Sequence, residues 1–358
     1  MDFADRLIEW QRIHGRHDLP WQSNHDAYRV WLSEIMLQQT QVETVINYYQ
    51  RFLARFPDVL SLADATLEAV LPLWSGLGYY ARARNLHKTA QIIRDRYGGD
   101  FPRQMDALTA LPGIGRSTAA AIMVFAFGAR EAILDGNVKR VLCRYFALEG
   151  FPGDAVNEKH LWRLAHQLLP AGHEHMATYI QAQMDLGATV CTRSKPDCVH
   201  CPLADQCQAR LQGRTEALPQ RRLNKKQRPE KHTAMLVLRH RNNVLLVRRP
   251  SSGIWGGLLS LPEAADRAAV LGLAARLAGP PVSEVVALPV LRHMFTHFTL
   301  TIEPWLVQTD TVTDSAAQYA VKHSCQWLEL AQALTEALPA PVKKILSCLP
   351  SEIPCRLL

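Results

Sequence analysis

Hydrophobic residues recur every three or four positions along the first 212 residues, with short breaks that contain glycine or proline. This period predicts amphipathic helices that share a core. Pro57 is expected to end the second helix, and no strand is expected in this part of the chain. We place the helices at 3–14, 30–56, 67–74, 81–97, 105–110, 117–127, 138–147, 156–169 and 179–190.

After residue 231 the hydrophobic period shortens to that of strands. Segments 233–239 and 243–248 flank Arg241 and Asn242, which predicts a β-hairpin. The segment 213–231 between the two regions holds seven Lys or Arg against two Glu and is interpreted as an exposed linker. Further strands are expected at 285–291, 297–307 and 325–328, with helices at 264–277 and 341–348.

Polar residues interrupt the most apolar helical segment, 30–46. Glu34, Gln38 and Gln41 are spaced i, i+4 and i+7, so one continuous helix would carry them on one face. Burying them is costly unless each finds a partner, which can be a basic residue, a neighbouring turn or a ligand. A desolvated glutamate has a raised pKa and can hold a proton ready to donate near neutral pH.

Four of the eight cysteines lie close together in the pattern C-x6-C-x2-C-x5-C. Such a cluster indicates a metal site, because a core gives no reason to gather thiols. Iron–sulfur is favoured over zinc, which usually has two C-x2-C pairs. Arg193 and Lys195 in the first loop suggest a basic finger for phosphate. The four residues are Cys191, Cys198, Cys201 and Cys207.

A tight turn at 111–117 opens a predicted helix. The glycines of Leu111-Pro-Gly113-Ile-Gly115-Arg-Ser117 allow close backbone approach, and the helix terminus offers free N–H groups. This design suits a helix-hairpin-helix clamp on phosphate, although a plain helix–helix turn has the same pattern.

Two further segments admit a functional and a structural interpretation. Asp135 precedes a predicted helix, so it is either an N-cap or a carboxylate that faces Glu34 and stabilises a positive sugar. Segment 74–84 mixes glycines, aromatics and arginines, which suits a wedge into a duplex or a set of core tyrosines.

Composition limits the class of protein. At 358 residues, with 48% hydrophobic and 20% charged, the chain is expected to form two or three globular domains. No apolar run is long enough to cross a membrane, and the acidic, amphipathic start lacks a signal peptide, so a cytoplasmic protein is expected. The net charge of +7 favours a polyanionic partner.

Together these motifs resemble the MutY family of adenine DNA glycosylases in the endonuclease III superfamily. The resemblance runs from Trp21 through the C-terminal region and implies a multidomain fold. Residues 1–212 would form an all-α glycosylase region with a helix-hairpin-helix near 105–127 and an iron–sulfur cluster loop at 191–207. Residues 213–231 would be a basic linker, and 232–358 an α+β Nudix-like domain that recognises 8-oxoguanine.

The resemblance also implies the activity, a monofunctional hydrolysis of adenine from mispairs with 8-oxoguanine or guanine during base excision repair. By motif, Glu34 protonates the departing adenine, Asp135 stabilises the oxocarbenium-like sugar, and Asn137 helps position the water or that aspartate. A [4Fe-4S] cluster on the four cysteines, a duplex DNA partner and a monomer are expected.

The resemblance to the family also implies contacts with DNA. Gln39 and Tyr79 match residues that enter the duplex around 8-oxoguanine, and the hairpin from Leu111 to Ser117 contacts phosphate. The recognition loop of the family, Phe-Ser-His, corresponds to Phe295, Thr296 and His297, where threonine keeps the hydroxyl and adds a methyl group.

Three alternatives remain less favoured. An endonuclease III-like glycosylase/AP lyase would carry a lysine at Ser117 and would lack the C-terminal domain. A mismatch-binding protein without catalysis would not need Glu34 and Asp135. A Nudix hydrolase would need carboxylates where the chain has the segment 271–276, Leu-Gly-Leu-Ala-Ala-Arg, and retains only Glu263 of the box.

Overall fold

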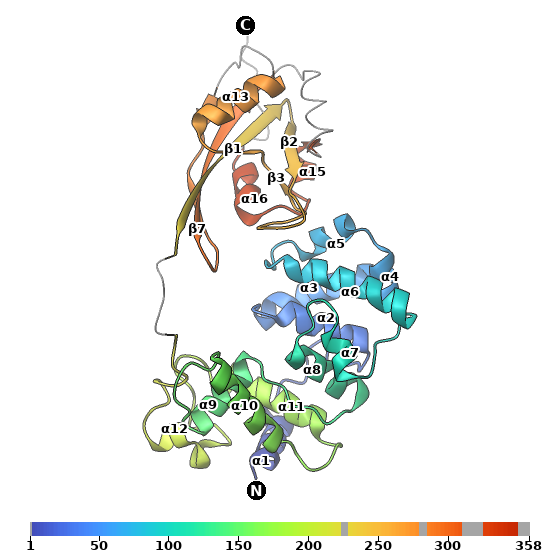
Figure 1. Cartoon of the computed structure of the whole chain (residues 1–358), viewed down its shortest axis with the longest axis vertical. Coiled ribbons are helices and arrows are strands. Elements are labelled where there is room, and N and C mark those ends of the chain that lie inside the picture. Colours follow the sequence, from blue (N-terminus) through green and yellow to red (C-terminus); the bar gives the residue numbers. More distant parts are fainter. Residues whose placement is uncertain (1, 223–227, 279–284, 310–324, 350–358) are drawn as a thin grey trace. The chain divides into compact units, whose positions relative to one another are not determined.

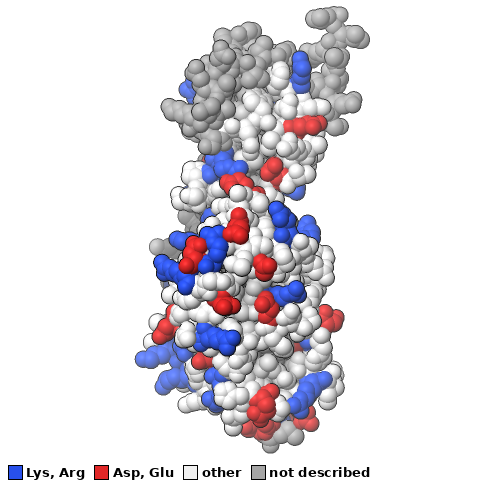
Figure 2. Space-filling model, turned by 90° about the vertical axis from the view of Figure 1, so that its right-hand side faces the viewer, with Lys and Arg blue, Asp and Glu red and all other residues white. Residues whose placement is uncertain are grey.

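The chain divides into two compact units in a computed structural model that describes residues 2–222, 228–278, 285–309 and 325–349. Unit 1 comprises residues 1–65 and 84–224, and unit 2 comprises 66–83 and 225–358 (Figure 1). On the face in Figure 2, cationic and anionic side chains are interspersed, so the positive net charge forms no single patch there. Within the described ranges, no helix has the length and apolarity needed to span a bilayer.

Unit 1 is built from helices, and residues 2–222 contain no strand in the described structure. The first helices are α1 (Phe3–His14), α2 (Ala27–Leu37), α3 (Val42–Arg55), α4 (Val59–Asp64) and α6 (Ala81–Tyr97). They are followed by α7 (Met105–Thr109), α8 (Arg116–Phe127), α9 (Gly136–Tyr145), α10 (Ala155–Gln167), α11 (Met176–Asp185), the π-helical turn η1 (Leu186–Val190), the 3₁₀ turn η2 (Ala204–Gln206) and α12 (Gln208–Leu211). The expected all-α region is therefore confirmed as a helical fold.

Local sequence explains where several helices begin. Asp2 and Asp58 start α1 and α4 with capping boxes, in which an aspartate accepts from a backbone amide three residues later. Thr66 caps α5 (Leu67–Trp74), which belongs to unit 2. The predicted helices at 3–14, 67–74 and 81–97 are confirmed with the same bounds.

The single helix predicted at 30–56 is wrong. Helix α2 ends at Leu37 and α3 begins at Val42, with Gln38 and Gln41 as the flanking caps. Between them Gln39 has a φ of 58°, in the left-handed region that a continuous helix excludes. Glu34, Gln38 and Gln41 therefore do not share one helical face.

One apolar core cluster of unit 1 is formed by α1, α8, α9, α10 and α11 (Figure 1). Ala119, Ala120 and Ala121 are fully buried on α8, and such small side chains let α8 pack closely against α2. Trp31 and Leu32 of α2 are also fully buried. Helix α2 is consequently held on several sides, which fixes the position of Glu34.

Unit 2 contains a mixed sheet in the order β3-β2-β1-β7-β5, with β4, β6 and β8 paired at its sides. Strands β1 and β7 run parallel at its centre, and α13 packs over them through a shared apolar cluster. The predicted hairpin is confirmed, because His240 of β1 pairs with Asn243 of β2 across Arg241 and Asn242. The predicted strand at 285–291 is two strands, β5 and β6.

The strands of unit 2 are β1 (Glu230–His240), β2 (Asn243–Arg248), β3 (Leu259–Ser260), β4 (Glu263–Ala264), β5 (Val285–Ala287), β6 (Leu291–Met294), β7 (Thr299–Gln308) and β8 (Cys325–Glu329). Its helices are α5, α13 (Arg267–Ala278), α15 (Leu330–Ala333) and α16 (Ala340–Ser347). The expected strand-rich C-terminal region is therefore confirmed.

Candidate active site and nucleic-acid interface

A cavity of about 620 Å³ lies within unit 1. Residues of α2, α8, α9 and α11 line it together with the segment that connects α1 to α2. Glu34 and Asp135, which are 101 positions apart in the sequence, both line this cavity. The fold therefore brings together the two carboxyl groups that the sequence analysis singled out.

Glu34 lies on α2 beside the buried residues Trp31 and Ile35. Burial, together with the smaller effect of the nearby charge of Asp135, raises the pKa of Glu34 from 4.5 to about 8. A carboxyl group with this pKa keeps its proton at neutral pH, as a general acid requires.

Asp135 is the N-cap of α9. One carboxylate oxygen accepts from the backbone N–H of Val138 at 2.8 Å, and the other accepts from Asn137 Nδ2 at 3.2 Å. Burial raises the pKa of Asp135, whereas these donors and the charge of Arg140 oppose the rise. No hydrogen-bond donor is among the causes of the shift at Glu34, so the two carboxyl groups lie in different electrostatic surroundings although burial raises the pKa of both.

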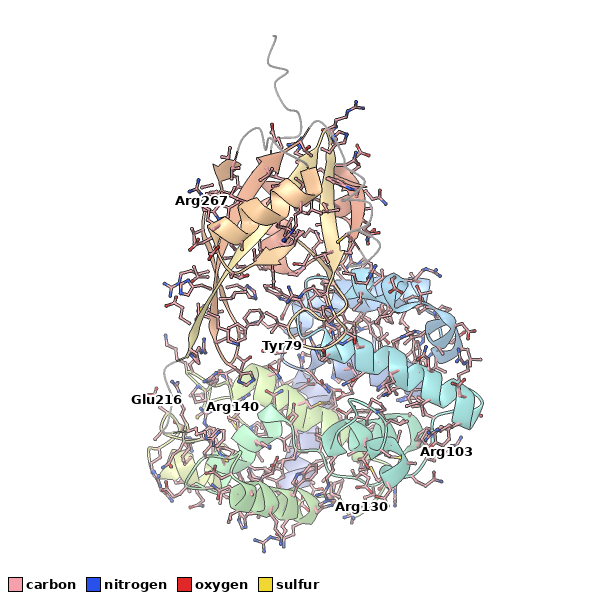
Figure 3. The ribbon with its side chains drawn as sticks, turned by 45° about the horizontal axis from the view of Figure 1, so that its top comes forward. Tyr79, Arg103, Arg130, Arg140, Glu216 and Arg267 are labelled. Carbon is pink, nitrogen blue, oxygen red and sulfur yellow. The ribbon has the colours of Figure 1, made fainter. Side chains whose placement is uncertain are left out.

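Asn137 is fixed by its own neighbours. Arg140, labelled in Figure 3, donates to Asn137 Oδ1 at 2.8 Å and to the carbonyl oxygens of Gly187 and Cys191 at 2.5 and 2.7 Å. These contacts orient the amide nitrogen of Asn137 towards Asp135. The N-terminus of α9 is thus tied to the π-helical turn η1 and to the cysteine that follows it.

Several lining residues of the cavity were missed by the sequence analysis. Trp21, His17 and Gln181 line it, and His17 Nε2 lies 3.0 Å from the carbonyl oxygen of Gln11. Trp21 also packs edge-on against Tyr49, with ring centroids 5.5 Å apart. The sequence signal that could have indicated Trp21 is its place in Leu19-Pro-Trp21, where an aromatic residue follows a turn-forming proline.

The predicted helix-hairpin-helix is present as α7, a turn and α8. Gly113 has a φ of 80°, and an added Cβ would lie 3.0 Å from Asn85 Cβ, so the turn needs glycine. Gly115 caps α8 without a side-chain hydrogen bond, which leaves amide donors at this helix terminus open to an anion. Leu111 is buried beneath the turn.

Ser117 lies in the first turn of α8 and lines the same cavity as Glu34. Its Oγ accepts a hydrogen bond from the backbone N–H of Leu134 at 3.0 Å. This contact joins the hairpin to the loop that precedes Asp135, so Ser117 has a defined structural role.

The four clustered cysteines line one small cavity next to Arg144. Arg144 is almost completely buried and donates to Cys191 Sγ at 3.3 Å and to the carbonyl oxygen of Thr192 at 2.6 Å. In the described ranges, no three His, Cys, Asp or Glu side chains are placed to share a single metal ion. Thiolates are ligands of zinc and of iron–sulfur clusters, so these four cysteines are the residues that could hold either kind of metal centre.

The remaining predicted contact residues lie outside the cavity. Gln39 is exposed, and Tyr79 is 51% exposed with a left-handed φ of 47°. Strained, exposed polar and aromatic residues are typical of binding positions. Both lie in loops, and neither lines the cavity with Glu34.

Residues 295–298 form the turn between β6 and β7 in unit 2. The backbone N–H of Phe295 donates to the carbonyl oxygen of Phe298 at 2.9 Å, and the two rings stack with centroids 4.6 Å apart. Trp255 packs against Phe295 at 5.2 Å. Thr296 and His297 are consequently presented, exposed, at the tip of a turn held by aromatic contacts.

Family comparisons identify both regions. Residues 32–167 match the HhH-GPD superfamily of base excision DNA repair proteins, and residues 233–348 match the NUDIX domain. The adenine DNA glycosylase of Buchnera aphidicola (subspecies Acyrthosiphon pisum) is 38% identical over 345 residues, 96% of each chain. The adenine DNA glycosylase of Mus musculus is 36% identical over 402 positions, which cover 96% of this chain and 77% of the mouse protein.

Solved structures resemble the helical region. A thermostable thymine-DNA glycosylase has a TM-score of 0.54 and 29% identity, with 59% of this chain and 95% of that chain covered. A non-covalent endonuclease III–DNA complex has a TM-score of 0.50 and 22% identity, with 59% and 94% covered. The second likeness supports the fold alone.

Proposed function

Because this chain belongs to the adenine DNA glycosylase family, we propose that it is a monofunctional enzyme that hydrolyses adenine from mispairs with 8-oxoguanine or guanine. It is a DNA glycosylase of base excision repair, and DNA is its partner. One observation carries the proposal: Glu34, with a pKa of about 8, and the N-capping Asp135 line one cavity.

Glu34 would act as the general acid. Adenine leaves poorly as an anion, so a proton must reach a ring nitrogen while the glycosidic bond breaks. The base must first rotate out of the stack to reach a buried carboxyl group. A cavity of about 620 Å³ offers room for one extruded base beside Glu34.

Asp135 would stabilise the oxocarbenium-like sugar that forms as adenine departs. An anion on one side and an acid on the other is the arrangement by which glycoside-cleaving sites operate. Asn137, which donates to Asp135 at 3.2 Å, would orient that carboxylate. Water would then add to the sugar and leave an abasic site.

The absence of lyase chemistry rests on Ser117. An endonuclease III-like enzyme would use an amine at this position to form a Schiff base with the sugar. A serine hydroxyl cannot do this, and its Oγ already accepts from Leu134 N–H. The strand is therefore expected to stay intact until alkali or another enzyme cleaves it.

We propose that Cys191, Cys198, Cys201 and Cys207 bind a [4Fe-4S] cluster. Support comes from four thiols around one cavity and from the buried guanidinium of Arg144, which offsets the negative charge of a thiolate-bound cluster. The cluster would stabilise the loop that carries Arg193 and Lys195. Purified protein is expected to contain iron and to absorb in the visible range, whereas a colourless sample loaded with zinc would contradict this proposal.

Recognition of 8-oxoguanine is assigned to the turn with Phe295, Thr296 and His297. Its exposed hydroxyl and imidazole can donate to and accept from a base edge. Hydrolysis of nucleotides is not proposed, since Glu263 of the Nudix box is ion-paired with Arg249 and the other box carboxylates are missing.

The decisive experiment incubates the protein with duplexes that carry adenine opposite 8-oxoguanine, opposite guanine or opposite thymine. Adenine release is expected from the first two, detected as strand breaks after alkali. A duplex with cytosine opposite 8-oxoguanine is the control. Intact adenine in every duplex would contradict the proposal, and strand breaks without alkali would favour the glycosylase/AP lyase alternative.

A further inference from the structure

An open groove of about 590 Å³ runs along α10, apart from the cavity that holds Glu34. It is lined by residues of α10 and by Arg116, the first residue of α8. Three of its lining residues are arginine or lysine, whereas Glu158 is the single carboxylate among them. None of these side chains has a role in the site described above.

The arginine at the end of this groove is held in a fixed plane. The guanidinium of Arg116 stacks on Trp162, with Cζ 3.9 Å from the ring centroid. One of its nitrogens donates to His166 Nε2 at 2.8 Å. Burial and the charge of Arg116 lower the pKa of His166, so the imidazole remains a neutral acceptor. This support leaves the other guanidinium donors oriented for an anion.

Two more cations follow along the same helix. Lys159 and Arg163 are exposed and spaced i, i+4, so they lie one turn apart on one face of α10. The carboxylate of Glu158 forms an ion pair with Lys139 at 2.5 Å, which neutralises the only acid of the groove. The groove therefore presents a row of positive charges, with the carboxylate of Glu131 acting only at its His166 end.

The position of the groove connects it to the DNA-processing elements of unit 1. Arg116 directly follows Gly115, the cap of the hairpin helix α8. At the other end, Lys139 lies one turn along α9 from Asp135 and contacts α10 through Glu158. The groove therefore borders the N-terminus of α8 through Arg116 and contacts α9 through the pair of Glu158 with Lys139.

We propose that this groove binds the phosphodiester backbone of the duplex beyond the mispair. The inference rests on the proposed function for the identity of the duplex, and it adds a backbone contact to it. A row of cations about one helical turn apart suits repeated phosphates better than a single small anion, and these contacts carry no sequence information. The contact would lengthen the duplex segment that the enzyme holds.

Binding measurements with the full chain test this inference. In a Glu34→Gln background, which prevents turnover, Lys159→Gln/Arg163→Gln is compared with the parent on a long mispaired duplex over a series of salt concentrations. The variant is expected to bind more weakly, and the slope of log K against log salt should fall by about 2, close to one unit for each lost phosphate contact. On a duplex that ends just beyond the mispair, the difference should shrink.

Arg96→Gln is the matched control, because Arg96 is exposed near the end of α6 and lines none of the described cavities. It removes one charge and should leave the slope unchanged. Arg116→Lys is a second test, because lysine keeps the positive charge but lacks the planar guanidinium that stacks on Trp162. This variant is expected to bind the long duplex more weakly.

An unchanged slope in the Lys159→Gln/Arg163→Gln variant, or an equal loss on long and short duplexes, would overturn the groove assignment. Adenine release by the parent enzyme is measured separately. If the parent releases no adenine while the slope still falls on mispaired DNA, the proposed function fails and the backbone contact stands.

Discussion

Gly187 lies so close to Asn137 that a Cβ added at position 187 would be 2.5 Å from Asn137 Cβ and 3.0 Å from its Cα. The neighbour is backbone as well as side chain, so it cannot simply rotate away. Gly187→Ala should push Asn137 away from Asp135 and slow adenine release by about 100-fold, the usual cost of a misplacement near 1 Å. Single-turnover rates at saturating enzyme measure this effect.

The control for that substitution is Gly272→Ala. Gly272 is exposed on α13, and an added Cβ there meets no atom within 4 Å. Alanine in a helix should raise the free energy of unfolding by about 0.5–1 kcal/mol without slowing the reaction. Equal rates for Gly187→Ala and the parent would show that Asn137 tolerates the added methyl group.

Glu34→Gln should remove the transferable proton while keeping the shape of the side chain. Turnover is expected to fall by about 100-fold to 10,000-fold, the usual range for a general acid, with binding of mispaired duplex retained. Glu9→Gln, on the exposed face of α1, is the control. A Glu34→Gln enzyme that cleaves at the parent rate refutes the assignment of the acid.

The pKa of Glu34 determines a pH dependence of the rate. Because burial raises this pKa to about 8, the acid form predominates at neutral pH and is lost as the pH rises further. The single-turnover rate should therefore decline above pH of about 8. A rate that stays constant through alkaline pH would argue against proton donation by Glu34.

The same pKa affects stability. Because the folded-state pKa lies above the unfolded value of 4.5, the folded protein binds this proton more tightly than the unfolded chain. The contribution of the proton to the free energy of unfolding is therefore fully present below pH of about 4.5 and is lost as the pH rises to about 8. In that window the slope is at most about 1.4 kcal/mol per pH unit. Glu34→Gln should abolish this part of the dependence, measured as denaturant unfolding at several pH values.

Arg144 joins the cysteine loop to the helical core. It donates to Cys191 Sγ, to the carbonyl oxygen of Thr192 and, at 2.9 Å, to that of Leu218. Arg144→Met should leave buried acceptors without donors and lower the free energy of unfolding by about 3–5 kcal/mol, with reduced iron content. Arg96→Met, at an exposed arginine of α6, should cost far less.

Thr296→Ala tests the recognition turn in unit 2. Removal of the hydroxyl should reduce the preference for adenine opposite 8-oxoguanine over adenine opposite guanine, while adenine release itself continues. The ratio of kcat/KM for the two duplexes is the measurement. Thr296→Ser, which keeps the hydroxyl and removes the methyl group, should preserve the ratio. If both variants match the parent, the turn does not read the lesion through this hydroxyl.

Much of the helical region was predictable from sequence because periodicity and caps agree there. The helix at 3–14 has an aspartate cap and a regular apolar stripe, and its bounds were correct. Helix α4 was missed although Asp58 and Ser61 form a capping box, because the helix has only six residues. Short helices give too few turns for a period to be recognised.

The break between α2 and α3 could not be predicted from its residues. Gln39 adopts a left-handed φ without glycine, proline or asparagine nearby, so no local signal marks the turn. Tertiary packing of α2 determines it instead. By contrast, the N-cap predicted for Asp135 is confirmed, and the residue also lines the cavity with Glu34, while its role at the sugar stays a prediction. How a residue such as Gln181 reaches that cavity depends on the packing of α11, which the sequence does not reveal.

The ion pair between Lys139 and Glu158 has a consequence for the product. Lys139 is the lysine of α9 and lies one turn from Asp135, and its Nζ contacts the carboxylate of Glu158, which holds the amine against α10. We therefore expect no covalent adduct between this amine and the opened sugar. The strand that carried the adenine is then expected to leave with its backbone continuous, so that a later enzyme would have to incise it at the abasic sugar.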